Sequence, residues 1–123
     1  MLLEGSAIEV QIDKDVVGGV LVVRLRGELD HHAVEPLRDE IEQSLENTHY
    51  RGLVLSFQGI DFMDSSGLGL ILGRYRTLSA RSGKMALCEV NTNLRKIFEL
   101  SGIFKVVPVY ASEQAALKAI KEA

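Results

Sequence analysis

The feature that most restricts the fold of this chain is a regular alternation of short apolar segments with helical patterns. Apolar runs of strand length lie at residues 53–57, 85–90 and 106–109, and a segment with helical spacing of its apolar residues follows each one. Strands that alternate with helices are joined by crossovers, which make neighbouring strands parallel. The sequence therefore predicts an α/β fold whose mixed, mostly parallel sheet has about five strands, with about four helices.

The chain opens with two further strands before this alternation begins. Residues 8–12 alternate between apolar and polar side chains, as in a strand with one wet face, and residues 20–26 are more apolar and so more buried. Gly18 and Gly19 between them are a turn signal. We expect the two strands to pair as a hairpin, with a connection longer than a minimal turn.

Four amphipathic segments have the spacing of helices. The first, at residues 33–46, contains Pro36, which is tolerable only in a first turn and so places the start near His32. Asn91, Gly102 and Ser112 have the chemistry of helix caps for the last two helices. The helix after residue 64 is expected to bury a stripe of five residues: Leu68, Ile71, Leu72, Tyr75 and Leu78. Pro108 makes the last strand an edge strand, because proline cannot donate a ladder hydrogen bond.

Length and composition favour one compact globular domain rather than a disordered tail or an assembly of domains. With 123 residues, 46% hydrophobic and 25% charged, we expect a single domain over 1–123, of which 1–7 form a loose N-terminal extension. The net charge of −3 argues against a nucleic-acid partner. Cys88 has no second cysteine to pair with, and its apolar neighbours predict an inert thiol in the core.

The start of the chain lacks a basic region followed by a long apolar stretch, and no segment is long enough to cross a bilayer. We therefore expect a cytoplasmic protein without a membrane partner, and a monomer when free.

The segment with the strongest chemical character is Asp64-Ser65-Ser66, at the predicted junction of a buried strand with a helix. Backbone N–H groups at a helix start have no internal partners and favour an anion, including a phosphate on a capping serine. Capping alone would also explain these residues. However, the carboxyl edge of a parallel sheet is where α/β folds place their functional sites.

The helix that follows has an unusual second face. Ser66, Gly69, Leu70, Gly73 and Thr77 lie opposite the predicted core stripe, where a solvated face would carry charged side chains. Each glycine costs about 1 kcal/mol of helix stability relative to alanine. A smooth face around an exposed Leu70 suits docking of another protein, although a neighbouring element of the same domain could equally cover it.

A second polar cluster, Asp30-His31-His32, enters the first helix and is expected at the same sheet edge. With Ser65 it admits an alternative, a small nucleotide-binding or hydrolytic enzyme. The spacing of Gly67, Gly69 and Gly73 after a strand is compatible with a dinucleotide loop, but serines occupy the turn. The Gly-x-Ser-x-Gly elbow and the Walker A sequence are both absent, and the histidines form no convincing metal set.

Two segments together resemble a known family. Residues 27–32, Gly-Glu-Leu-Asp-His-His, and residues 62–75, which begin Phe-Met-Asp-Ser-Ser-Gly-Leu-Gly, resemble the anti-sigma factor antagonists, which belong to the STAS domain family. The similarity is greatest to the branch that antagonises the anti-sigma-F factor of sporulating bacilli, and it extends through residue 105. The chain departs from that branch mainly before Val20, where residues 15–19 are extended.

The resemblance implies a phospho-regulated partner switch rather than an enzyme. Members bind an anti-sigma factor that is also a serine kinase, and so release a sigma factor for transcription. The kinase phosphorylates the serine that corresponds to Ser65 and ends this binding, and a separate serine phosphatase restores it. No cofactor or metal is implied for the antagonist itself. The expected partner-binding residues are Asp30, His31, Asp64, Ser66, Gly67, Gly69, Leu70 and Gly73.

Overall fold

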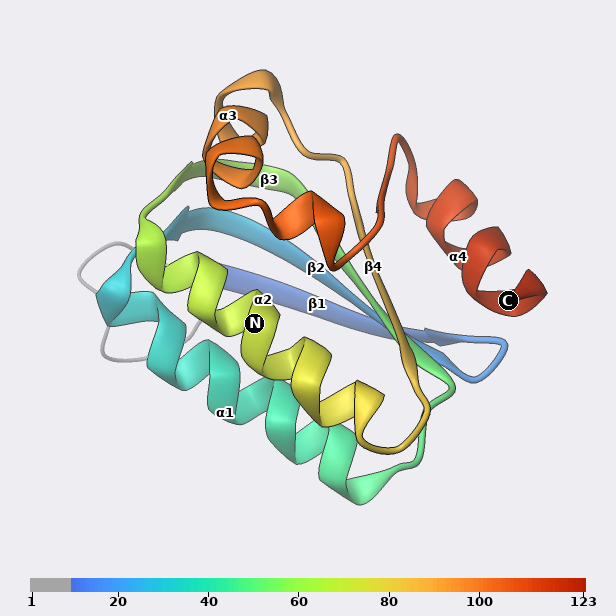
Figure 1. The fold of residues 1–123 in the computed structure, drawn as a ribbon. Helices are drawn as coiled ribbons and strands as arrows, with labels where there is room; N and C mark the ends of the chain where they lie inside the picture. The colour runs from blue at the N-terminus through green and yellow to red at the C-terminus, as the bar shows by residue number, and fades with distance from the viewer. Residues whose placement is uncertain (1–9) are drawn as a thin grey trace.

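The computed structural model describes residues 10–123 and contains one five-stranded sheet with strand order β1-β2-β3-β4-β5 (Figure 1). Strands β1 and β2 are antiparallel, and each later neighbour is parallel. The predicted fold class is confirmed. The elements are β1 (Val10–Val17), β2 (Val20–Leu29), α1 (His31–Asn47), β3 (Gly52–Met63), α2 (Ser65–Ser79), β4 (Lys84–Cys88), α3 (Thr92–Ser101), the 3₁₀ turn η1 (Ile103–Lys105), β5 (Val109–Tyr110) and α4 (Glu113–Glu122).

The β1–β2 connection is a minimal turn, so the expectation of a longer one is wrong. Val17 pairs directly with Val20, which leaves only Gly18 and Gly19 in the loop. Their φ angles of 58° and 79° give the left-handed conformation that a two-residue hairpin turn demands and that glycine adopts without strain. The extra residues before Val20 therefore lengthen β1. Ile8 and the proposed extension at 1–7 lie outside the described residues.

Helices cover the two faces of the sheet unequally (Figure 1). The larger apolar core lies between one sheet face and α1, α2 and α3, and includes Leu37, Phe57 and Phe98. A smaller cluster on the other face is covered by α4 through Ala116 and Ile120. The sheet is thus the middle layer of three, and α1 and α2, which begin where β2 and β3 end, lie on the same face.

Helix α1 begins at His31, close to the predicted start near His32, but other details of the elements differ from the sequence prediction. Pro36 is the sixth residue of α1, beyond the first turn. It removes the donor for the His32 carbonyl, at the exposed start of the helix where water can replace it. Strand β4 ends at Cys88 because Glu89 has a φ of 61°, outside the extended region.

The last strand is shorter and later than predicted. Residues 103–105 form a 3₁₀ turn, and Val107 is fully buried in the larger core, so β5 begins at Val109. Pro108 precedes it and accepts a hydrogen bond from the Leu87 N–H at 2.9 Å. The predicted position of the last strand at the edge of the sheet is confirmed. The caps at Asn91, Gly102 and Ser112 are confirmed as well.

Candidate phosphorylation and docking site

The site is built where β2 and β3 end side by side. Leu29 and Met63 are paired in the parallel ladder, and the next residue of each strand is an aspartate, Asp30 or Asp64. The Asp64 N–H donates to the Leu29 carbonyl at 3.3 Å, which holds the two chain segments together as they leave the sheet. The predicted juxtaposition of the two polar loops at one sheet edge is confirmed.

Asp64 links the starts of two helices. Its Oδ1 accepts a hydrogen bond from the Ser66 N–H at 2.8 Å, and its Oδ2 accepts one from the His31 N–H at 3.1 Å. Asp30 caps α1 independently, because its Oδ1 accepts from His32 and Ala33, each at 3.0 Å. Capping is thus part of what this cluster does, and one carboxylate joins α1 to α2.

Ser65, the first residue of α2, is exposed, whereas Ser66 is half-buried. Among the described residues, no side chain or backbone group forms a hydrogen bond with the Ser65 hydroxyl. This hydroxyl is therefore accessible to an enzyme in solution. Two nearby N–H groups, those of Ser66 in α2 and His31 at the start of α1, are already bonded to the Asp64 carboxylate.

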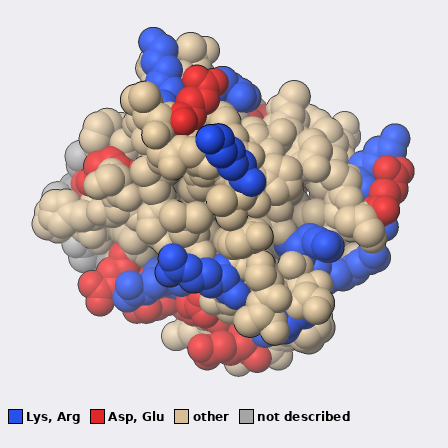
Figure 2. Space-filling model, viewed as in Figure 1, with Lys and Arg blue, Asp and Glu red and all other residues tan. Residues whose placement is uncertain are grey.

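The outward face of α2 is open along its first half. Methyl groups placed on Gly69 and Gly73 would meet nothing within 4 Å, so within residues 10–123 no neighbouring element covers these positions. The helix carries no charged side chain before Arg74. Figure 2 shows charged side chains at the lower left, over α1, and also at the top and right edges of this face, with a largely uncharged band between them. The sequence alternative in which the domain covers this face therefore holds for Leu70, which is buried in the larger core, and for Thr77, which bonds Glu42 of α1, but not for Gly69 and Gly73.

Two of the predicted docking residues are buried. Leu70 is only 2% exposed and belongs to the larger core, so its expected exposure is wrong. Gly67 is buried as well, and a methyl group there would lie only 2.4 Å from the Met63 Sδ. The buried positions of α2 are rotated from the predicted stripe, because the helix packs against α1 as well as the sheet: Gly67, Leu70, Ile71, Arg74 and Leu78.

Arg74 is a contact residue that the sequence analysis missed. Its side chain is 9% exposed and its Nε lies 2.5 Å from the Glu42 Oε1 of α1. The Thr77 hydroxyl donates to the same carboxylate oxygen at 3.2 Å. Burial lowers the pKa of Arg74, and the Glu42 charge opposes that shift. The sequence does contain a signal for the burial of Arg74. It lies three residues after Ile71 and four before Leu78, so helical spacing puts it on the same face as these apolar residues.

The geometry gives no support to a hydrolase. His31 and His32 are exposed and pack against one another, with ring centroids 3.9 Å apart. Neither forms a hydrogen bond with Ser65 in the described part of the chain, so Ser65 lacks the adjacent base that an activated nucleophile uses. His31 Nδ1 lies 3.9 Å from the Asp64 Oδ2. Across residues 10–123, no three metal-ligating side chains gather to hold an ion.

Comparison with known proteins decides the family. The sequence-family model of the STAS domain matches residues 11–116, almost all of the described residues. The chain belongs to the STAS domain family. The resemblance seen in the two sequence segments is thereby confirmed.

Relatives of this STAS domain include named regulators. An anti-sigma F factor antagonist of Paenibacillus polymyxa is 42% identical over 110 residues, which are 89% of this chain and 94% of the relative. The anti-sigma F factor antagonist of Lysinibacillus sphaericus is 41% identical over 95 residues, covering 77% of this chain and 81% of the relative.

Solved structures agree with this placement. The anti-sigma factor antagonist SpoIIAA in its unphosphorylated form superimposes with a TM-score of 0.80 at 35% identity, covering 92% of this chain and 98% of that one. The Bacillus cell fate determinant SpoIIAA in the phosphorylated form gives a TM-score of 0.71 at 36% identity, with 89% and 99% covered. None of the helices within residues 10–123 combines the length and apolar character that a membrane span needs.

Proposed function

We propose that this STAS domain is an anti-sigma factor antagonist that Ser65 phosphorylation switches off. In the unphosphorylated form the domain binds an anti-sigma factor and thereby releases a sigma factor. The observation that carries the proposal is an exposed serine hydroxyl at the start of α2, beside the open face at Gly69 and Gly73. The 42% identical antagonist and the solved SpoIIAA structures support it.

The residues of the site have distinct proposed roles. Ser65 accepts the phosphate, and Asp64 and Ser66 shape the corner. Gly69 and Gly73 let the partner approach the α2 backbone closely. Asp30 and His31 frame the surface from the neighbouring loop. The buried Gly67 and Leu70 support this surface from beneath rather than touching the partner.

Phosphate acts on binding through charge. It adds about −1.5 to −2 charges at neutral pH, directly beside the Asp64 carboxylate. Inside a docked interface the phosphate must lose water while facing like charge. A penalty of about 4 kcal/mol would weaken binding roughly a thousandfold. No backbone movement is needed, because a local charge is enough to exclude the partner.

The anti-sigma factor is proposed to be the serine kinase as well, supplying Mg-ATP and the catalytic groups, and a separate phosphatase reverses the modification. The domain itself catalyses nothing and acts in the cytoplasm.

The decisive test compares substitutions at Ser65 for binding to the cognate anti-sigma factor. We expect Ser65→Ala to bind like the native domain and to resist inactivation by kinase and ATP, whereas Ser65→Asp binds at least tenfold more weakly. The matched control is Ser79→Asp, which puts the same charge on an exposed serine at the far end of α2. Equal affinities of the Ser65→Ala and Ser65→Asp variants would refute the switch.

A second measurement addresses the enzyme alternative. Peptide mass spectrometry after incubation with kinase and ATP is expected to place phosphate on Ser65. Turnover of a nucleotide or an ester by the isolated domain, abolished in Ser65→Ala, would instead favour an enzyme.

A further inference from the structure

Helix α4 is attached to the sheet by a small apolar contact. Among the described residues it is the only helix on its face, and its buried side chains there are Ala116 and Ile120, with Leu117 partly buried. The helix has ten residues, fewer than an isolated helix needs to be even marginally stable in water. Its stability must therefore come from contacts with the rest of the domain.

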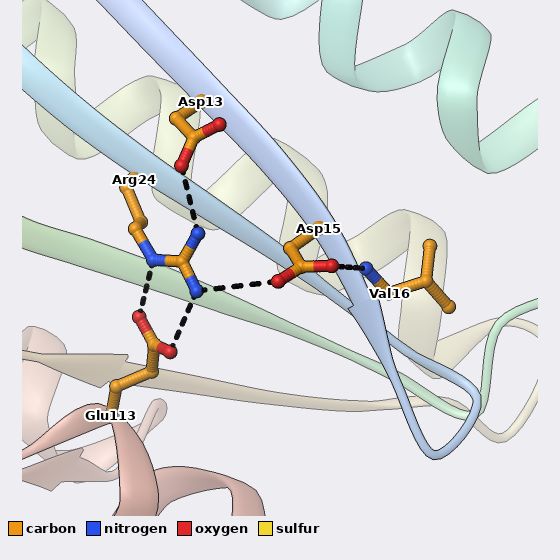
Figure 3. A network of polar contacts seen from close by, with 5 residues as sticks. All are labelled: Asp13, Asp15, Val16, Arg24 and Glu113. Atoms are coloured by element: carbon orange, nitrogen blue, oxygen red, sulfur yellow. Dashed lines mark hydrogen bonds and ion pairs between the residues drawn. The ribbon is translucent and has the colours of Figure 1, made fainter.

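The polar contact with the shortest distances lies at the start of the helix. Arg24 of β2 donates from Nε to the Glu113 Oε1 at 2.7 Å and from Nη2 to the Glu113 Oε2 at 2.9 Å. This is the two-pronged geometry in which a guanidinium binds a carboxylate most strongly. Figure 3 shows the same guanidinium held from β1, where Asp13 accepts from Nη1 at 2.8 Å. Asp15 lies 3.6 Å from Nη2.

Replacing Glu113 by a neutral residue would not leave the Arg24 guanidinium without a carboxylate partner. Arg24 faces three carboxylates, so it would keep Asp13 and Asp15 as partners if Glu113 were lost. At the other end of α4 the tie is weaker, because Arg51 Nη2 donates to the Lys121 carbonyl at 3.5 Å. The Arg24–Glu113 pair is thus the principal polar tie between α4 and the β1–β2 hairpin.

We propose that the Arg24–Glu113 pair is a clamp that controls a local opening of α4, in which this helix leaves the sheet while the rest of the domain stays folded. Local opening is expected where an element buries few apolar groups and the remaining core is intact without it. The larger core contains no residue of α4. Opening would uncover a strip of the sheet that includes Val22, Val54 and Cys88. The inference concerns the face opposite α2 and is independent of the proposed role of Ser65.

Cys88 is a built-in reporter of this opening. It is the only cysteine of the chain, it is fully buried, and it belongs to the cluster that α4 covers. Burial raises the pKa of its thiol to about 11, so the closed form is unreactive toward an aromatic disulfide reagent near pH 8. The rate of labelling under native conditions then measures the fraction of molecules in which α4 is open.

The experiment follows Cys88 labelling of the full chain in increasing, sub-denaturing urea, alongside global unfolding by circular dichroism. Local opening exposes little surface, so at low urea the labelling rate should be almost independent of urea. We expect Glu113→Gln to raise this rate about fivefold, the scale of a partly exposed two-pronged ion pair. Glu122→Gln, which changes an exposed glutamate of the same helix that has no ion pair among the described residues, should leave it unchanged.

Two results would overturn the proposal. If labelling at all urea concentrations has the same urea dependence as global unfolding, α4 does not open by itself. If the low-urea rates of the native chain, Glu113→Gln and Glu122→Gln coincide, the Arg24–Glu113 pair does not control the opening.

Discussion

Asp64 contributes to stability as well as to the proposed switch, because it caps α2 and bonds the first N–H of α1. We expect Asp64→Ala to lower the free energy of unfolding by about 1–2 kcal/mol, the range for loss of a helix cap. Asp64→Asn, which retains one acceptor oxygen, should fall between Asp64→Ala and the native domain. Urea denaturation measures the difference. The control is Asp61→Ala at an exposed aspartate three residues earlier. If the Asp61→Ala and Asp64→Ala domains are equally stable, the bridge between the helices contributes nothing.

The glycines of α2 have opposite surroundings, although their spacing in the sequence gives no hint of it. Gly73→Ala places a methyl group in open space and should raise the free energy of unfolding by up to about 1 kcal/mol, through helix propensity. Gly67→Ala forces a methyl group against the Met63 side chain and should lower it by about 1–3 kcal/mol, as overpacking does. Urea denaturation of the two variants tests both signs. Equal effects would contradict the packing of α2 described here.

Helix positions were predictable from sequence wherever the signal was local. Asn91 bonds the Leu94 N–H at 2.9 Å and Gly102 has a φ of 76°, as their residue types predicted. The exposed face of α2 was only partly predictable. Leu70 was assigned to the surface because helical spacing gives a single apolar stripe, whereas α2 contacts the sheet and α1 at once. Burial of Arg74 depends on Glu42, a partner on another helix that α2's own sequence does not reveal.

At the scale of the whole molecule, burial of Cys88 links stability to alkaline pH. The thiol pKa rises from its ordinary value of 9.0 to about 11 on folding. Below pH 9 the thiol is protonated in both states and this contribution to stability is complete. It is lost as pH rises from 9 to 11, by about 2–3 kcal/mol in total, because the unfolded chain releases the proton first.

The measurement is the free energy of unfolding across pH 8–11 for the native chain and for Cys88→Ala. The variant should lose less stability over this interval, since the other titrating groups are common to both proteins. Parallel pH profiles would show that Cys88 does not titrate on unfolding.

The order of strands and helices in the whole fold followed from the alternation of apolar segments, which leaves few topologies open. The hairpin loop and the start of β5 did not, because both depend on backbone conformation. Gly18 and Gly19 close a two-residue turn, and the 3₁₀ turn at residues 103–105 displaces the last strand. Asp64 is a typical capping residue, so the sequence predicts that Ser65 stands at a helix start. The hydrogen bond from the His31 N–H to Asp64 is visible only in the folded chain.

The pairing of Leu29 with Met63 has a consequence for how this domain tolerates insertions and deletions. Because these two residues are paired, Asp30 and Asp64 leave the sheet side by side, although they are 34 residues apart in the sequence. The last register shift between the two strands lies between Gly27 and Glu28. A single residue gained or lost beyond it would offset the two loops by a strand repeat, roughly 3.3 Å, more than a hydrogen bond can stretch. Strand length is therefore as much a determinant of this corner as the identity of its side chains.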